Sequence, residues 1–390
     1  LDTSYKNIMD KFIYLDNAAT TPIYKNVFEK MLPYIIDIYG NPSARYKLSI
    51  EVKKAIENAR KQIADTLGVN TKEIYFTSGG TEANNWALIG TCEALNEKGK
   101  HIITTKVEHK AILNTCKYLQ EKGYEVTYLD VEDNGMINLR KLKESIREDT
   151  ILASIMIANN EVGTIMPIEE IAKIVKKRGV LLHTDAVQAY GHIDIDLKKV
   201  QIDMLSASAH KFHGPKGIGF LYIRNGTIIK PLIYGGGQES GLRGGTENVA
   251  SIIGMGYAAE KIFHDFTQKK EKIVELREYL IGRIENEIPD IILTGDRSNR
   301  LPNHVSFCVK NVTAIILVDQ LSKENICISS GSACDNNFIS DSHVLKAMGY
   351  DDDIAKSAIR VSLSEFNTIE EIDFFVDVLK NKIKELREWM

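Results

Sequence analysis

Short apolar runs alternate with amphipathic helical stretches through the middle of the chain, and this alternation limits the fold more than any other feature. We expect strands at residues 74–76, 102–104, 125–129, 151–157, 180–183, 204–206 and 219–223, and helices at 82–97, 110–121, 139–148 and 168–178. Gly99, Gly123 and Gly179 follow helical stretches, as glycine often does at helix C-termini. The pattern predicts an α/β fold, a mainly parallel sheet covered by helices on both faces. Ligands bind such sheets beyond the carboxyl ends of the strands.

The regular alternation of expected strands and helices ends towards the C-terminus. A long helical pattern covers residues 247–288, and strand-like runs at 303–309, 326–329 and 358–363 then mix with helical runs at 314–322 and 368–382. This mixture predicts a second, smaller α+β domain. We place the large domain at residues 16–262 and the small domain at residues 1–15 and 263–390, with the N-terminal stretch 5–14 packed against the small domain.

Composition argues against several classes of function. The 390 residues are 44% hydrophobic and 26% charged with a net charge of −4, which is ordinary for a globular protein and gives no overall attraction to nucleic acid. The apolar runs are too short to span a membrane, and the first residues show no secretory pattern. Five cysteines without a Cys-x-x-Cys pair indicate free thiols. We therefore expect a cytoplasmic protein that binds neither membrane nor nucleic acid.

A candidate phosphate site lies between the first expected strand of the large domain and the helix that follows. Residues 77–82 read Thr-Ser-Gly-Gly-Thr-Glu. Glycines at such a junction expose backbone N–H groups, and the helix dipole favours an anion there. The loop lacks the Gly-Lys-Ser/Thr ending of a P-loop, which disfavours a nucleoside triphosphate. A structural tight turn is the alternative.

A candidate catalytic lysine, Lys211, lies between two expected strands. It belongs to residues 208–217, Ser-Ala-His-Lys-Phe-His-Gly-Pro-Lys-Gly, where small residues let a ligand approach closely. This setting suits a lysine whose amine forms an imine with an aldehyde cofactor. The alternative is an ordinary solvated charge at the end of a strand.

A carboxylate, Asp185, follows another buried strand. Such a carboxylate can keep the nitrogen of a heterocycle protonated, as pyridoxal phosphate requires because its protonated pyridine ring is the electron sink. A helix N-cap is the alternative role for Asp185. His183 shares its face of the strand and suggests a metal, but no third ligand is near, so we expect no metal site.

Two more strand ends carry polar groups. His109 follows the strand at 102–104 and can stack on a flat ring, although a lone histidine is more often structural. Residues 158–163, Ala-Asn-Asn-Glu-Val-Gly, close a further strand with amides that can bind a ring hydroxyl or a carboxylate. A phosphate anchor, a ring stacker, a pyridinium partner and an imine-forming lysine thus follow one another along the chain. Together they predict an enzyme that uses pyridoxal phosphate.

From residues 14–21 to 366–368, nearly its whole length, the chain resembles the cysteine desulfurases of the NifS/IscS type. These belong to the class V aminotransferase group and have PLP-dependent fold type I, the aspartate-aminotransferase-like fold. The motifs that carry the resemblance are Gly-Asn-Pro-Ser at 40–43, the loop at 77–85, Asn-Asn-Glu-Val-Gly at 159–163, Asp-Ala-Val-Gln at 185–188, the segment 208–217, Gly-Gly-Gly-Gln-Glu at 235–239 and Ser-Gly-Ser-Ala-Cys at 330–334.

The resemblance implies a role for each matched residue. Lys211 would form the imine, Asp185 would pair with the pyridinium, and His109 would stack on the ring and transfer protons. The residues that would hold the cofactor are Gly80, Thr81, His109, Asn160, Asp185, Gln188, Ser208, His210, Lys211 and Thr246, the last reaching the phosphate of the other subunit in a homodimer. Arg360, with Asn160, would bind the substrate carboxylate, a task that suits the guanidinium fork.

Cys334 lies in a small, polar, glycine-containing stretch at residues 329–337, which is typical of a loop rather than a core. The other four cysteines fall in expected helices or strands, as buried thiols usually do. A loop thiolate has the access that attack on a substrate sulfur requires. The resemblance therefore implies that L-cysteine becomes L-alanine, with a persulfide on Cys334 whose sulfur passes to an acceptor protein for iron–sulfur cluster assembly or tRNA thiolation.

Three departures from the family pattern concern partners more than the reaction. Asp-Asn-Asn at 335–337 follows the cysteine, and Ser240 and Glu365 stand where the family commonly has arginine. The alternatives to a desulfurase are a selenocysteine lyase or a cysteine desulfhydrase with the same cofactor, and, in another class, a non-catalytic sulfur-carrier or scaffold protein. The intact set of cofactor residues argues against a scaffold, and an ordinary aminotransferase has no use for the Cys334 loop.

Overall fold

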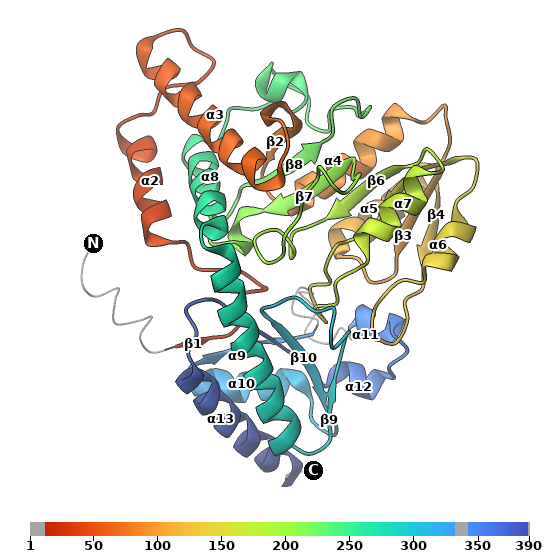
Figure 1. Cartoon of the computed structure of the whole chain (residues 1–390), viewed down its shortest axis with the longest axis vertical. Coiled ribbons are helices and arrows are strands. Elements are labelled where there is room, and N and C mark those ends of the chain that lie inside the picture. Colours follow the sequence, from red (N-terminus) through yellow and green to blue (C-terminus); the bar gives the residue numbers. More distant parts are fainter. Residues whose placement is uncertain (1–11, 332–341, 389–390) are drawn as a thin grey trace.

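The described part of the chain, residues 12–331 and 342–388 of this computed structural model, contains two main sheets, the helices packed on them, and a column of two helices that runs beside both sheets (Figure 1). The larger sheet occupies the upper half of the view and the smaller sheet the lower half. The column consists of α8 (Val249–Phe263) and α9 (Phe266–Glu287), and it extends from one sheet to the other. Within the described ranges, every helix is too short or too polar to cross a membrane.

The larger sheet is mainly parallel, as the sequence predicts. In order across the sheet, its described strands are β2 (Ile74–Thr77), β8 (Gly219–Ile223), β7 (Met204–Ser208), β6 (Leu181–Asp185), β5 (Thr150–Ser154), β3 (His101–Thr105) and β4 (Glu125–Leu129). From β7 to β4 every neighbouring pair is parallel, whereas β8 runs antiparallel to both of its neighbours. Parallel neighbours need long crossover connections; α5 lies between β3 and β4 and α7 between β5 and β6, whereas residues 186–203 connect β6 to β7 without a helix.

Helices cover both faces of this sheet because its strand residues alternate between two cores. Ile102 packs in a cluster with α4 (Gly80–Ala94) and α5 (Lys110–Glu121), whereas its neighbour Ile103 packs in the cluster on the other face. That second cluster draws on α2 (Lys25–Ile36), α3 (Lys47–Leu67), α6 (Leu139–Ser145), α7 (Ile168–Lys176) and α8.

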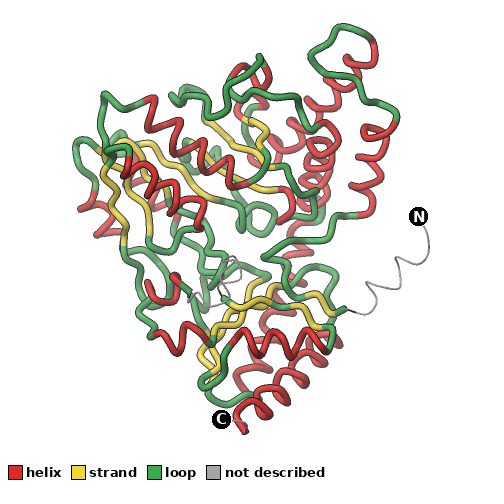
Figure 2. Tube along the Cα trace, turned by 180° about the vertical axis from the view of Figure 1, so that it is seen from behind, coloured by secondary structure: helices red, strands yellow, loops and turns green. Residues whose placement is uncertain are grey.

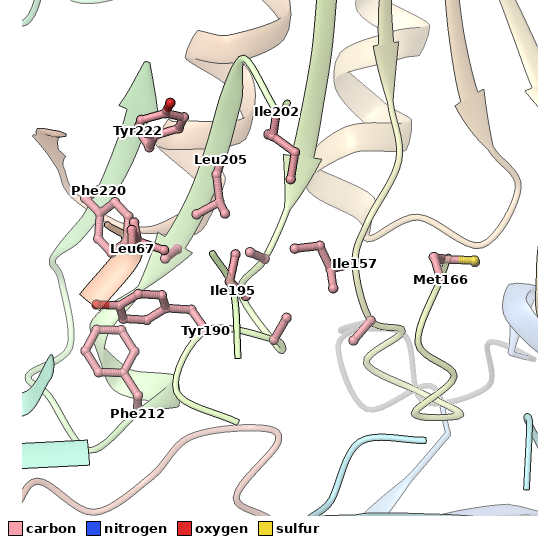
Figure 3. Close-up of a cluster of buried hydrophobic side chains, with 14 of the residues drawn as sticks. Leu67, Ile157, Met166, Tyr190, Ile195, Ile202, Leu205, Phe212, Phe220 and Tyr222 are labelled. Carbon is pink, nitrogen blue, oxygen red and sulfur yellow. The ribbon is translucent and has the colours of Figure 1, made fainter. Parts of the chain in front are cut away.

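A buried aromatic group fixes the chain next to the candidate lysine. Tyr190 makes edge-on contacts with Phe212 and Phe220, at 4.9 and 5.1 Å between ring centroids (Figure 3). The Tyr190 hydroxyl also forms a hydrogen bond of 2.6 Å with Thr66 Oγ1. Because Phe212 directly follows Lys211, this packing holds the lysine's backbone in place.

The smaller sheet is antiparallel, with described strands in the order β12 (Ser329–Ser330), β13 (Ala358–Ser362), β10 (His304–Val309) and β9 (Ile291–Leu293). It packs on α9, α10 (Ala314–Lys323) and α13 (Ile369–Glu388), seen from behind in Figure 2. The short helices α11 (His343–Ala347) and α12 (Asp352–Lys356) flank it. Among the described residues, 3-10 turns occur at η2 (Thr71–Glu73), η3 (Ala209–Lys211) and η4 (Gln238–Gly241).

The N-terminal stretch joins the C-terminal part of the chain, as expected for the residues that the structure describes. β1 (Ile13–Tyr14) pairs in parallel with β11 (Ile326–Cys327) in a separate two-stranded sheet. The rest of the expected stretch, residues 5–11, lies outside the described part. The division into domains at 262 and 263 stays a prediction, and the break between α8 and α9 lies close to it.

Two elements that the sequence predicts as continuous are each interrupted in the structure. The single helix expected at 247–288 is two helices, because His264 has extended backbone and Asp265 has a left-handed φ of 58°, which interrupts the helical hydrogen bonds. The strand expected at 326–329 is divided into β11 and β12, which join different sheets. The sequence reading also named neither α2 nor α3.

The aromatic group predicts a large effect of truncation. We expect Phe220→Ala to lower the free energy of unfolding by about 3–5 kcal/mol, because it removes a fully buried ring and leaves a cavity. Phe374→Ala is the matched control, because Phe374 on α13 is 49% exposed, and we expect a change below about 1 kcal/mol. Urea unfolding followed by circular dichroism measures both. Equal losses in the two variants would contradict the account.

Candidate active site

One cavity, of about 320 Å³, gathers the residues that the sequence singled out. It lies beyond the carboxyl ends of the parallel strands, where β6 ends at Asp185 and β7 ends at Ser208. The residues that line it are Ala18, Ala19, Gly80, Thr81, Asn84, His109, Met156, Ala158, Asn160, Asp185, Val187, Gln188, Ser208, His210, Lys211 and Arg360. Of the expected site residues, Thr246 does not line the cavity, and Cys334 lies outside the described residues.

Lys211 is the last residue of η3, directly after β7. Its Nζ donates hydrogen bonds to the backbone oxygens of Ala18 at 2.6 Å and Ala19 at 2.8 Å. Gln188 Nε2 also donates to the Ala18 oxygen, at 2.9 Å. The Lys211 amine is therefore fixed by hydrogen bonds in the cavity, and the lysine is not a solvated charge at the end of a strand. Sequence reasoning did not name Ala18 and Ala19 for this task, since backbone oxygens leave no side-chain signal.

The Asp185 carboxylate is 5% exposed and is fixed by two donors. Its Oδ2 accepts from Asn84 Nδ2 at 2.6 Å, and its Oδ1 accepts from the Val187 backbone N–H at 2.9 Å. The bond to the Val187 N–H is a local capping contact of the turn that follows β6, similar to the N-cap role considered as the alternative for Asp185. The same carboxylate also lines the cavity. Asn84 is the residue that sequence reasoning missed here. Its position four residues after Gly80 on α4 places both on one face of the helix.

His109 is the N-cap of α5, and its Nδ1 accepts the Ala111 backbone N–H at 3.1 Å. Nε2 is then the nitrogen that carries the proton in the neutral ring. Burial lowers the pKa of His109, and Lys211 lowers it further, whereas Asp185 raises it. A neutral imidazole with a proton on Nε2 therefore lines the cavity next to the lysine and the aspartate.

The start of α4 forms a compact anion site. A Cβ on Gly80 would approach Val187 Cγ2 to 2.6 Å, so the close packing of the helix on the strand end requires glycine. Ser208 and His210 lie beside Gly80 and Thr81. Burial lowers the pKa of His210 to about 4, and Lys211 and Lys216 add to the effect. Backbone N–H groups, a helix dipole and neutral side chains suit a phosphate monoester.

Arg360 reaches the cavity from β13 of the smaller sheet. Its Nη1 donates to the Asn160 backbone oxygen at 3.0 Å, and its Nη2 donates to Asp16 Oδ1 at 2.9 Å. The cavity thus receives its lysine, carboxylate and imidazole from the larger sheet and a buried guanidinium from the smaller one.

Several residues lie elsewhere. Thr246 is exposed, and Ser240 is exposed with a left-handed φ of 58°. Glu365 accepts the Tyr24 hydroxyl at 3.1 Å and lies 3.7 Å from Lys269 Nζ. Neither of the two departures from the family pattern at 240 and 365 lines the cavity. The prediction that these substitutions alter partner binding remains a prediction.

His183 has a structural role. Its Nδ1 and Nε2 form hydrogen bonds of 2.9 Å with Ser154 Oγ and Ser206 Oγ, and burial lowers its pKa to about 3. Within residues 12–331 and 342–388, no group of three or more His, Cys, Asp and Glu side chains is placed to hold a metal ion. Of the cysteines in these ranges, Cys92, Cys116 and Cys308 are buried, Cys327 is half-buried, and none lines the cavity.

Comparison with known proteins decides the family. A model of the class-V aminotransferases matches residues 13–375. The cysteine desulfurase IscS of Dictyoglomus turgidum is 48% identical over 379 residues, which cover 97% of this chain and 96% of that protein. The cysteine desulfurase IscS of Methanosarcina thermophila is 47% identical over 378 residues, or 97% and 93% of the two chains. The chain belongs to the class-V aminotransferases, among the cysteine desulfurases.

Solved structures of cysteine desulfurase relatives confirm the fold expected from the sequence, PLP-dependent fold type I. A NifS-like protein superposes with a TM-score of 0.90 at 42% identity and covers 97% of this chain and 100% of its own. SspA, solved in complex with cysteine, superposes with a TM-score of 0.81 at 39% identity and covers 91% of this chain and 99% of its own.

Pyridoxal phosphate is the cofactor of this family, and the residues present fit it. The cavity combines a glycine-based anion site at a helix N-terminus, a fixed carboxylate at Asp185 and a lysine amine at Lys211. Asn84 Oδ1 is buried and has no hydrogen-bond partner among the described residues, which leaves a polar acceptor beside Asp185. A phosphate, a ring nitrogen and an aldehyde would each find a matching group.

The anion site predicts a loss of cofactor binding when Gly80 gains a side chain. We expect Gly80→Ala to weaken the affinity for pyridoxal phosphate about tenfold or more, because the new Cβ displaces Val187 or the start of α4. Gly282→Ala on α9 is the control, since a Cβ there meets nothing within 4 Å. Titration of the cofactor-free protein by absorbance gives both constants. An unchanged constant for Gly80→Ala would count against this anion site.

A second prediction concerns Glu108, which precedes His109 and is fully buried. Its Oε1 accepts from Thr105 Oγ1 and the Met156 N–H, and burial raises its pKa from 4.5 to about 8. The stability that this protonated carboxyl contributes is fully present below pH 4.5 and is lost as the pH rises through about 8. Glu108→Gln cannot titrate, so we expect the wild type to lose up to a few kcal/mol relative to this variant across that window.

The control for Glu108 is Glu121→Gln at the exposed end of α5, which we expect to keep the wild-type pH dependence. Urea unfolding at a series of pH values measures all three proteins. If the wild type and Glu108→Gln gave parallel stability curves, the buried carboxyl would not hold its proton as described.

Proposed function

We propose that this chain is a pyridoxal-phosphate-dependent enzyme that converts L-cysteine to L-alanine and leaves the sulfur as a persulfide on Cys334. The observation that carries the proposal is the convergence of Lys211, Asp185, His109 and Arg360 on one cavity. The names of its relatives, cysteine desulfurase IscS, and the cysteine complex of SspA support the substrate.

The cofactor would lie between the two ends of the cavity. Gly80, Thr81, Ser208 and His210 would hold its phosphate, and Asn160 and Gln188 would contact the side of its ring. When bound, pyridoxal phosphate supplies an electron sink for the charge that develops at the substrate α-carbon. The Asp185 carboxylate, fixed by Asn84 and Val187, would keep the ring nitrogen protonated.

Three side chains would act on the substrate. Arg360 would bind the α-carboxylate and so orient the amino acid. Lys211 Nζ would take the proton from the α-carbon, and His109, whose ring carries its proton on Nε2, would hold or return protons beside it. Desolvation keeps the pKa of His109 low, so the ring is neutral at neutral pH and the proton on Nε2 is the one it can donate.

Cys334 would remove the sulfur. Its thiolate attacks the substrate sulfur, a sulfur–sulfur bond forms, and the bond from the β-carbon to sulfur breaks. The β-carbon keeps the electron pair, takes a proton, and the product is L-alanine. A thiol on an acceptor protein then takes the outer sulfur from Cys334. Iron–sulfur cluster assembly and tRNA thiolation in the cytoplasm are the destinations that the family resemblance implies.

We also propose that the active protein is a homodimer. Large apolar side chains are exposed on α2 and just after it, among them Ile35, Ile36 and Tyr39, the last 76% exposed. Several large apolar side chains exposed within one short segment favour an interface there. Thr246, exposed outside the cavity, would then reach the cofactor phosphate of the partner subunit.

The test is a product balance with L-cysteine and a thiol reductant. We expect the wild type to form sulfide and alanine in equal amounts, and Cys334→Ala to lose about 100-fold or more of both, because the attacking thiolate is gone. Cys327→Ala is the control, since this half-buried cysteine does not line the cavity, and it should keep wild-type rates.

Each of the other outcomes would indicate a different activity for this protein. Sulfide with pyruvate in place of alanine would make the protein a desulfhydrase. Activity that persists in Cys334→Ala would favour selenocysteine-lyase chemistry. A purified protein that binds no pyridoxal phosphate and turns over nothing would be a sulfur carrier or a scaffold.

A further inference from the structure

Asp16 lies outside the cavity lining; its side chain contacts Arg360, and its backbone oxygen accepts from the Ala19 N–H. Its Oδ1 accepts a hydrogen bond from Arg360 Nη2 at 2.9 Å, while Asp16 itself does not line the cavity. The Arg360 side chain is 3% exposed and that of Asp16 is 16% exposed, so this is a largely buried ion pair. Asp16 has no role in the function proposed above.

A buried guanidinium needs partners, because an uncompensated charge in the interior is strongly unfavourable. Asp16 supplies the charge partner for Arg360, and the Asn160 backbone oxygen accepts from the other terminal nitrogen at 3.0 Å. These two bonds fix both the position and the plane of the guanidinium before any substrate arrives. Arg360 Nε is buried and has no hydrogen-bond partner among the described residues, so the arginine keeps donor capacity for a ligand.

Asp16 is itself held against the strand that carries Arg360. It forms a parallel β-bridge with Ser362 on β13. The Asn17 side chain donates to the Ser362 backbone oxygen at 2.9 Å, and the Ala18 N–H donates to Ser362 Oγ at 2.8 Å. Because the Ala18 oxygen also accepts from Lys211 Nζ, one short segment sets the distance between the guanidinium and the amine.

We propose that Asp16 is a positioning residue for substrate recognition, which holds the Arg360 guanidinium in the orientation that binds the α-carboxylate of the amino acid. The proposal rests on the proposed function, in which Arg360 binds that carboxylate. Asp16 touches neither cofactor nor substrate in this account. Its effect is therefore specific to ligands that carry the carboxylate.

The matched control is its neighbour Asn17. Asn17 also links the segment to β13 through Ser362, but it forms no hydrogen bond with Arg360, whose described partners are Asn160 and Asp16. If the segment only held the two parts of the structure together, Asp16→Ala and Asn17→Ala would weaken the binding of all ligands to the same extent. If Asp16 positions Arg360, Asp16→Ala weakens the binding of a ligand with a carboxylate more than the binding of the corresponding amide, and Asn17→Ala does not.

The experiment measures equilibrium binding of L-alanine and of L-alaninamide to the pyridoxal-phosphate-loaded enzyme, from the change in the visible spectrum. We expect Asp16→Ala to weaken L-alanine about tenfold and to leave L-alaninamide within about twofold of wild type, because a misaligned guanidinium loses a charge-assisted hydrogen bond to the carboxylate. Asp16→Asn keeps an oxygen acceptor for Arg360, and we expect an intermediate loss. Asn17→Ala should leave the ratio of the two constants unchanged.

Arg360→Lys tests the carboxylate-binding role of Arg360 separately from the positioning role of Asp16, because lysine keeps the positive charge but lacks the two-pronged guanidinium. If Arg360→Lys weakens L-alanine selectively but both Asp16 variants do not, the positioning role is wrong and the proposed function stands. If Arg360→Lys itself shows no selectivity, the carboxylate site of the proposed function fails. Equal weakening of both ligands by Asp16→Ala, or none, overturns the proposal. If Asp16→Ala does not fold, Asp16→Asn decides the question.

Discussion

The segment of residues 16–21 is hydrogen-bonded to β13 of the smaller sheet and to η3, the turn that follows β7 of the larger sheet, and the active site depends on this link. At one end Asn17 and Ala18 bind Ser362 on β13. At the other end the Thr21 N–H and hydroxyl donate to the His210 backbone oxygen, next to Lys211. Together with the hydrogen bond from Arg360 to the Asn160 backbone oxygen, this connection fixes the separation between the buried guanidinium and the amine of Lys211, and reactions of this kind need such fixed geometry.

Burial gives the charged groups of the cavity their chemical character. Asp185 is 5% exposed and His109 is half-buried, so interactions among the ionisable groups there are stronger than at the surface. The carboxylate is held by two donors and the imidazole by a backbone N–H, so each group meets a ligand in a defined state and orientation. The neutral state of the histidine beside Asp185 and Lys211 is a consequence of the fold and not of the residue alone.

Much of the fold and of the candidate site could be predicted from the sequence, because strand ends carry the reactive side chains. The helix at 110–121 and the strands at 125–129 and 219–223 were predicted to the residue, and the polar groups expected after the strands meet in one cavity. The break at Asp265 was missed because a left-handed residue leaves no gap in the apolar pattern. The carbonyls of Ala18 and Ala19 were missed because backbone atoms have no sequence signature.

The most direct test of the central claim is to locate the covalent attachment of the cofactor. The loaded protein is reduced with borohydride, digested, and analysed by mass spectrometry. The account predicts the mass of a reduced pyridoxyl phosphate on the peptide that contains Lys211, and its disappearance in Lys211→Ala. Attachment at another lysine, such as Lys216, or no covalent attachment at all, would contradict the assignment of this cavity as the catalytic site.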